Sequence, residues 1–220
     1  FYIGLLFILA DSYLGIGKQL PLTFVVSGIA GLGAAFMVYH LSTYFKKLTI
    51  YIISILLTAT ALVGHAFLTP GPFAFVPLTL LVSMIYFGNA MVLIIVPSLL
   101  SDIVDYGTLK FGSDRAATYF SVYLFMVKAL GGVGSACGLA IIAWYNFDAS
   151  ALTHNQESVF GLHLAIAYLP TLMLLVSLFL IVKTPINAHR HHIIQKRLTQ
   201  RRQRQARELN TSVTNPLINT

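Results

Sequence analysis

The chain has 220 residues, of which 57% are hydrophobic and only 10% are charged. A soluble domain would carry roughly 25% charged residues, so the composition excludes an ordinary soluble protein and favours a membrane protein. The formal net charge of +7 comes mainly from the region after Thr184, and a basic segment directly after an apolar one is typical of cytoplasmic retention and lipid attraction, not of nucleic-acid binding.

Six apolar segments are predicted to form membrane helices. Residues 1–10 begin within apolar sequence, without Met or a basic n-region, so we expect them to be the end of a first span that starts upstream. The five complete spans are predicted at 19–41, 49–69, 73–100, 116–145 and 161–182. The longest polar loops between them are Asp102–Arg115 and Asn146–Ser158. The chain is thus predicted to be all-α, with a transmembrane bundle at 1–183 and a basic cytoplasmic tail at 184–220.

The distribution of basic residues predicts the orientation of these spans. When the loops are assigned to alternate sides, one side holds nearly all the cations and the other holds only Lys18. Lys and Arg in short loops mark the cytoplasmic side. The sequence therefore predicts a multi-pass protein of the cell (inner) membrane with its C-terminus in the cytoplasm. The cations on the cytoplasmic side are those of the tail together with Lys46, Lys47, Lys110, Arg115 and Lys183.

Lys128 is the only charged side chain between Ala116 and Tyr145. It lies about 18 Å along a helix from Arg115, close to the middle of the hydrocarbon. A central Lys costs at least ~2.5–3.5 kcal/mol on insertion scales, and membrane proteins keep such a charge where it faces a polar cavity or a counter-ion. We therefore expect a transport pathway beside Lys128.

Small residues near Lys128 predict close helix packing, because small side chains let helix backbones approach each other in lipid. Lys128, Gly131 or Gly132, and Ser135 share one helix face. The residues expected to pack against a neighbouring helix are Gly131, Gly132, Gly134, Ser135 and Gly138. A second stripe of small residues is formed by Ser27, Gly31 and Ala35.

The segment from Ser101 to Arg115 contains the run Asp102-Ile-Val-Asp105-Tyr106-Gly107, and it is followed by Tyr119-Phe-Ser-Val-Tyr123 and by Lys128-Ala-Leu-Gly131. This ordered set resembles the glycoside–pentoside–hexuronide:cation symporters, the melibiose-carrier branch of the major facilitator superfamily. The resemblance implies that the chain is the C-terminal six-helix bundle of a twelve-helix carrier with its first helix truncated. Its partners would be the lipid bilayer, a small polar solute and the N-terminal half of the same polypeptide.

The resemblance also implies roles for individual residues. Lys128 would lie near the coupling-cation and solute sites and interact with carboxylates of the N-terminal half. The cytoplasmic gate would consist of Asp102, Asp105, Lys110 and Arg115. Acids near a helix C-terminus are poorly placed for the helix dipole, so Asp102 and Asp105 are expected to attract cations. Further candidates, for a substrate wall, are Tyr86, Asn89, Tyr119, Ser121 and Tyr123.

The sequence departs from that family at Leu109, Ala116 and Met91-Val92-Leu93, where relatives often carry Trp, an acid and an aromatic platform. These departures weaken the assignment of a sugar as the solute. The predicted function is Na⁺- or H⁺-coupled symport of a glycoside-like solute by alternating access. The alternatives are the same fold carrying an amphiphilic or lipid-like solute, and a non-transporting sensor or scaffold.

We expect neither an enzyme nor a protein cofactor, because the sequence has no nucleophile–base pattern, metal-ligand motif or phosphate loop. The coupling ion would bind mostly in the N-terminal half. His40 and His65 lie in predicted spans near opposite ends, where interfacial packing is expected and a shared metal is excluded. His189, His191 and His192 are expected to be solvated in the basic tail.

Overall fold

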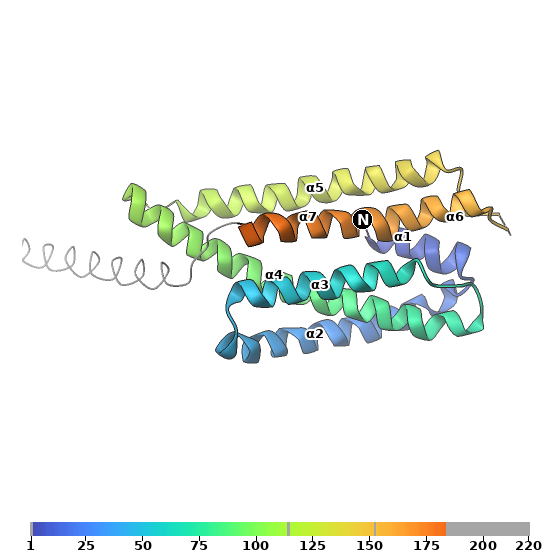
Figure 1. The fold of residues 1–220 in the computed structure, drawn as a ribbon, viewed down its shortest axis with the longest axis horizontal. Helices are drawn as coiled ribbons and strands as arrows, with labels where there is room; N and C mark the ends of the chain where they lie inside the picture. The colour runs from blue at the N-terminus through green and yellow to red at the C-terminus, as the bar shows by residue number, and fades with distance from the viewer. Residues whose placement is uncertain (1, 114, 152, 184–220) are drawn as a thin grey trace, which may run out of the picture. The chain divides into compact units, whose positions relative to one another are not determined.

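The computed structural model describes residues 2–113, 115–151 and 153–183, and every regular element in this part of the chain is a helix (Figure 1). A helix lies in each of the six predicted segments. Five of the helices are long and apolar enough to cross a membrane, and the sixth, Tyr2–Tyr13, is shorter. The predicted basic tail at 184–220 and its three histidines lie outside the described residues.

The helical elements follow one another with short connections. The first helix comprises α1 (Tyr2–Ile8) and a π-helical turn, η1 (Leu9–Tyr13). The last comprises α6 (Gln156–His163), the π-helical turn η4 (Leu164–Tyr168) and α7 (Leu169–Lys183). Between them lie α2 (Leu20–Tyr44), α3 (Lys47–His65), α4 (Phe75–Phe111) and α5 (Ala116–Trp144), with short 3-10 turns at Gly17–Gln19 and Pro72–Ala74.

Local chemistry explains several helix ends. Pro21 occupies the first turn of α2, where its missing N–H is not needed. Asn155 caps α6, because its side-chain oxygen accepts a hydrogen bond from the Ser158 amide at 2.7 Å. This cap starts α6 before residue 161, the predicted beginning of the last span. Gly112 has a φ of 74°, which suits glycine, and it ends α4.

The prediction of a polar loop at Asp102–Arg115 is wrong for most of this segment. α4 continues past the predicted end at residue 100 and reaches Phe111. Between Asp102 and Phe111 there is no proline, and the single glycine, Gly107, costs only about 1 kcal/mol within a helix. Charged residues at the end of an apolar span leave the hydrocarbon without leaving the helix, which explains the difference.

The chain divides into two compact units. Among the described residues, the bundle unit comprises residues 2–97 and 123–183, and the hairpin unit comprises Ser98–Val122. Both α4 and α5 contribute to each unit. Pro97 lies inside α4 at the division, where a proline removes one backbone hydrogen bond.

Within the bundle unit, α4 packs closely against α2 and α3. Thr23 and Thr79 are joined by a hydrogen bond of 3.0 Å, and Ser27 and Ser83 by one of 3.2 Å. One turn further along α2, a Cβ built at Gly31 would lie 3.7 Å from the Tyr86 carbonyl oxygen. The predicted small-residue stripe of α2 thus packs against α4 at Ser27 and Gly31.

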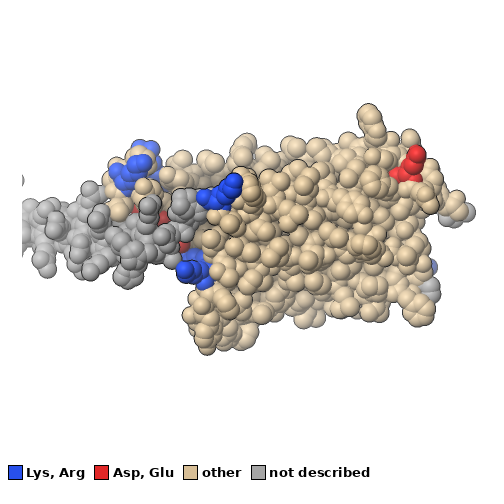
Figure 2. All heavy atoms as spheres, in the orientation of Figure 1, with Lys and Arg blue, Asp and Glu red and all other residues tan. Residues whose placement is uncertain are grey.

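The stripe does not extend as predicted, because Ala34 is buried and Ala35 is exposed. A separate apolar core surrounds the first helix and η4. The buried side chains of this core include Leu5, Leu6, Leu9, Leu78, Val82, Leu162 and Ile166. On the face shown in Figure 2, the surface between the ends of the bundle unit consists of uncharged residues, as expected for a wall that faces lipid or other apolar partners.

Candidate functional site

Lys128 lies on an exposed face of α5 in the bundle unit. The part of the chain that the structure describes contains no ion pair or hydrogen bond of its ammonium group. Its neighbours Phe125, Val127 and Leu130 are also exposed, so this stretch of α5 is open in the described chain. A cation at mid-span needs a polar partner, and none contacts Lys128 among the described residues.

The predicted packing face beside Lys128 is open too. A Cβ built at Gly131, Gly132 or Gly134 would meet no atom within 4 Å. Ser135 donates a hydrogen bond to the Gly131 carbonyl oxygen at 3.0 Å, so it is satisfied within α5. Gly138 is buried. The packing role of the other small residues stays a prediction.

The four predicted gate residues all lie in the hairpin unit. Asp102 and Asp105 are half-buried on the last turns of α4, and Lys110 and Arg115 are exposed. The two cations lie over the same aromatic ring: the Lys110 ammonium is 5.4 Å and the Arg115 guanidinium 5.9 Å from the centre of Phe111. Arg115 also donates from Nε to Ser113 Oγ at 3.1 Å. The gate thus combines two acids with two cations held at the turn, and its role stays a prediction.

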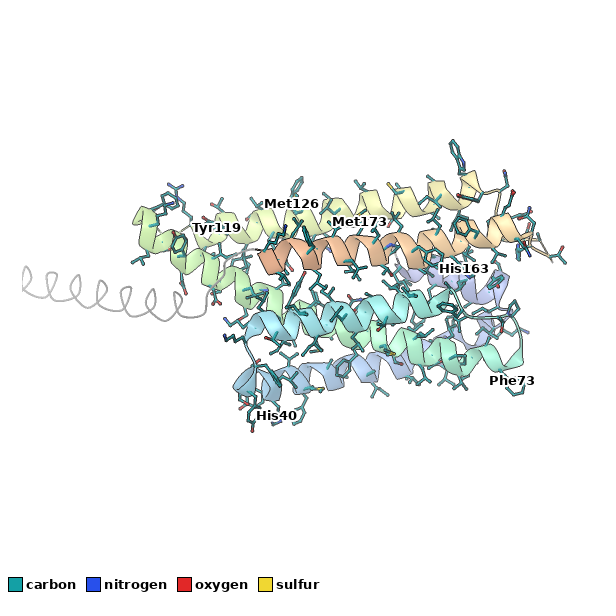
Figure 3. The ribbon with its side chains drawn as sticks, in the orientation of Figure 1. His40, Phe73, Tyr119, Met126, His163 and Met173 are labelled. Atoms are coloured by element: carbon teal, nitrogen blue, oxygen red, sulfur yellow. The ribbon has the colours of Figure 1, made fainter. Side chains whose placement is uncertain are left out.

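Tyr119, a predicted substrate-wall residue, packs against Gly107 in the hairpin unit (Figure 3), and its substrate-wall role stays a prediction. A Cβ built at Gly107 would lie 3.1 Å from the Tyr119 hydroxyl oxygen and 3.5 Å from its nearest ring carbon. The absence of a side chain at Gly107 therefore allows α5 to approach α4 here. Helix packing thus explains why a glycine follows Tyr106, and the sequence alone did not indicate this role.

Replacing Gly107 with alanine is expected to destabilise the protein by about 1–3 kcal/mol, because the new methyl group must push the Tyr119 hydroxyl away. The double variant Gly107→Ala/Tyr119→Phe should regain most of this stability, since its nearest ring contact is an ordinary 3.5 Å. Thermal unfolding of the purified proteins would check both. Equal stability of the wild type and the two variants would contradict the close packing.

The remaining substrate-wall candidates lie in different surroundings. Tyr86 is half-buried and its ring centre is 6.4 Å from that of Phe24 on α2. Asn89, on the same face of α4, is exposed, as is Leu93. Ser121 is exposed in the hairpin unit, and Tyr123 is half-buried in the bundle unit. An exposed amide at mid-span requires polar surroundings, so Asn89 fits a cavity or a polar partner.

Sequence reasoning missed a buried polar cluster beside the first helix. His65 was expected to pack at the interface, but it is 0% exposed and it is joined to the Tyr2 hydroxyl at 2.9 Å. His163 is 9% exposed, and its Nε2 atom has no partner among the described residues. No spacing rule connects Tyr2 with His65, so a single sequence carries no signal for this pair.

The long apolar helices, with charged residues at their ends, define a multi-pass helical membrane protein. The profile of the MFS/sugar transport protein family matches residues 1–188. The chain therefore belongs to the MFS/sugar transport protein family, which confirms the resemblance seen in the sequence and shows a transporter family, not an enzyme.

A curated relative agrees with this assignment. The chain is 27% identical over 163 residues to a protein of Bacillus subtilis (strain 168) described as "Uncharacterized symporter YjmB". The match covers 73% of this chain but only 34% of the relative. The chain thus spans about a third of the length of that symporter.

Proposed function

We propose that the protein is a secondary active transporter that couples the entry of Na⁺ or H⁺ to the uptake of a sugar-like solute. The observation that carries the proposal is Lys128, a cation at mid-span on an open face of α5. Membership of a sugar-transport family and similarity to a symporter support it. A coupled carrier needs charged groups within the membrane whose pairing changes with the bound ion.

The same proposal assigns the described chain to the C-terminal half of the carrier. The N-terminal half would supply the carboxylates that pair with Lys128 and bind the coupling ion. Alternating access would then rock this bundle against the other half around a site near the middle of the membrane. With the cytoplasmic side set by the basic loops, the hairpin from Ser98 to Val122 would lie at the inner mouth of the carrier.

Residue roles follow from this arrangement. Asp102 and Asp105 would form ion pairs at the inner mouth that break and re-form as the carrier changes state, with Lys110 and Arg115 as local cations. Tyr86, Asn89 and Tyr123 fit the solute-facing wall better than Tyr119, whose hydroxyl packs on Gly107. Aromatic faces and amides suit a sugar, since they contact its C–H faces and its hydroxyl groups.

The test is uptake by the full-length protein in proteoliposomes, with radiolabelled melibiose and methyl β-galactoside as probes. We expect a Na⁺ or H⁺ gradient to drive accumulation above equilibrium and an ionophore to abolish it. Solute uptake that is unchanged by either the Na⁺ or the H⁺ gradient would contradict symport. Absence of any glycoside uptake would contradict the sugar class.

A second cargo, an amphiphilic solute, is favoured by one observation. Leu93 is 69% exposed on the face of α4 that also carries Asn89, so an apolar side chain stands beside an amide there. Competition of glycoside uptake by alkyl glycosides of increasing chain length distinguishes the two. Stronger competition with each added methylene group would support the amphiphile, because each buried CH₂ contributes about 0.8 kcal/mol.

A further inference from the structure

Three histidines from three different elements contact the first helix of the bundle unit. His65 of α3 is bonded to the Tyr2 hydroxyl at 2.9 Å. His154, in the loop before α6, is joined through Nε2 to the Ser12 carbonyl oxygen at 3.1 Å. His163 of α6 meets Tyr13 edge-to-face, with ring centres 5.6 Å apart. Imidazole is the side chain whose charge changes most readily near neutral pH, so this grouping indicates a site that binds protons.

The hydrogen bonds of His65 define where its proton lies. Nδ1 is 2.8 Å from the Ala61 carbonyl oxygen, which can only accept, so Nδ1 carries the hydrogen. In the neutral ring Nε2 is then an acceptor, and the Tyr2 hydroxyl donates to it. His65 is thus a buried imidazole whose neutral form carries its hydrogen on Nδ1 and accepts the Tyr2 hydroxyl at Nε2.

His163 is the second buried imidazole of the group. Its Nε2 atom is buried and has no partner among the described residues, and Figure 3 shows the residue on the side of α6 that faces the first helix. His163 directly precedes η4, and Tyr13 ends η1. π-helical turns occur frequently at functional sites, and here two of them flank the same ring contact.

The third histidine links this group to the loop between α5 and α6. The His154 ring stacks on Phe147, with centres 4.4 Å apart and an interplanar angle of 11°, and it is only half-buried. Nearby, the Ser150 hydroxyl and amide donate to the Asp148 carboxylate at 2.6 and 2.9 Å. These bonds, with a smaller contribution from His154, hold the pKa of Asp148 below its ordinary value. Asp148 is therefore ionised beside His154 at neutral pH.

The titratable groups around the two buried imidazoles are mostly tyrosines. Tyr2 and Tyr13 face them from the first helix, and Tyr86 of α4 is close enough to act electrostatically on Tyr2. From α5, Tyr145 packs against Gly161, close to His163 in sequence. Among the residues that the structure describes, no contact joins either imidazole to a carboxylate or an ammonium group. A second proton on the cluster would therefore have no counter-ion in this state.

We propose that His65 and His163 form a proton-binding cluster with Tyr2 and Tyr13 of the first helix. Protons reach this cluster from the loop that carries His154. The proposal rests on the proposed function and names the proton as an ion that this half of the carrier binds. Rows of ionisable side chains that include histidines serve as proton relays within membrane proteins.

The proton step is balanced within the cluster. A proton that arrives at His65 forms a bond to Nε2, and the Tyr2 hydroxyl turns from donor to acceptor without losing its own hydrogen. The imidazolium then carries one positive charge that the apolar surroundings disfavour. Protonation therefore favours a conformation in which water reaches the first helix, and this preference couples proton binding to a change of state.

The test uses the full-length carrier with ¹⁵N-labelled histidine in lipid nanodiscs and follows the imidazole resonances between about pH 4.5 and 8. We expect the two buried imidazoles to change charge when the pH range is extended down to about 3. His163→Gln should remove one transition and shift that of His65, and Tyr2→Phe should shift the His65 transition alone. The matched control is His40→Gln, because His40 is exposed near the C-terminal end of α2 (Figure 3). This variant should lose only the resonance of His40.

Uptake of the labelled glycoside gives an independent readout. Accumulation driven by an acidic exterior should fall about tenfold in His163→Gln and should stay near the wild-type level in His40→Gln. Imidazoles that stay neutral at every pH, with unchanged acid-driven uptake in His163→Gln, would overturn the proton cluster. Na⁺-driven accumulation in the same protein would still support symport, so the two proposals can fail separately.

Discussion

Replacing Lys128 with glutamine is expected to reduce cation-driven solute accumulation to simple equilibration. The substitution removes the one charge in the middle of α5, and it leaves any carboxylate that faces it without a partner. Breaking one side of a buried ion pair costs about 3–5 kcal/mol, which corresponds to a loss of coupling of roughly a hundredfold or more. The measurement is gradient-driven uptake of labelled glycoside, together with exchange in the absence of a gradient.

Two further variants make this experiment specific. Lys183→Gln removes a cation from the end of α7, where its ammonium lies 4.3 Å from the centre of Phe179, and uptake should stay near wild type. Lys128→Arg keeps the charge with a different shape and should retain part of the coupling. Lys128→Gln should still insert into the membrane, since it removes an insertion cost of ~2.5–3.5 kcal/mol. Accumulation at the wild-type level in this variant would refute the coupling role.

Hydropathy predicted the helices well because the cost of an unpaired backbone group in lipid leaves little choice of structure. The segment predicted at 116–145 forms α5, Ala116–Trp144. Lys128 could also be recognised from the sequence alone, because a charge within a long apolar run needs an explanation.

The errors came from features that hydropathy does not report. The end of α4 depends on where Gly112 adopts a positive φ, and not on where charged residues begin. The burial of His65 depends on Tyr2, which lies 63 residues away in the sequence. The contact of Tyr119 with Gly107 is another feature that hydropathy does not report, and the substrate-wall role of Tyr119 stays a prediction. Contacts between distant helices decide these roles.

A substitution of Gly88 by alanine is expected to destabilise the bundle unit strongly. Gly88 is the point where α4 meets α3: a Cβ built there would overlap Thr58 Oγ1 and lie 3.0 Å from the Ser54 carbonyl oxygen. Thr58 Oγ1 also donates to that carbonyl oxygen at 2.9 Å, so the hydroxyl has little room to move. Overpacking of this kind costs about 1–3 kcal/mol. Thermal unfolding of the purified carrier, followed by loss of the monodisperse fraction, would measure it.

The double variant Gly88→Ala/Thr58→Ala separates crowding from other effects of the mutation. Removing Oγ1 takes away the nearest atom and leaves the Ser54 carbonyl oxygen, so about half of the lost stability should return as a coupling energy between the two sites. The matched control is Gly33→Ala on α2, where a Cβ would meet nothing within 4 Å. That change should be neutral or should stabilise by up to about 1 kcal/mol, because alanine favours the helix over glycine. Equal unfolding temperatures of Gly88→Ala and Gly33→Ala would show that α3 and α4 do not approach each other as closely as their backbones indicate. The packing that positions Tyr86 and Asn89 on α4 would then need another explanation.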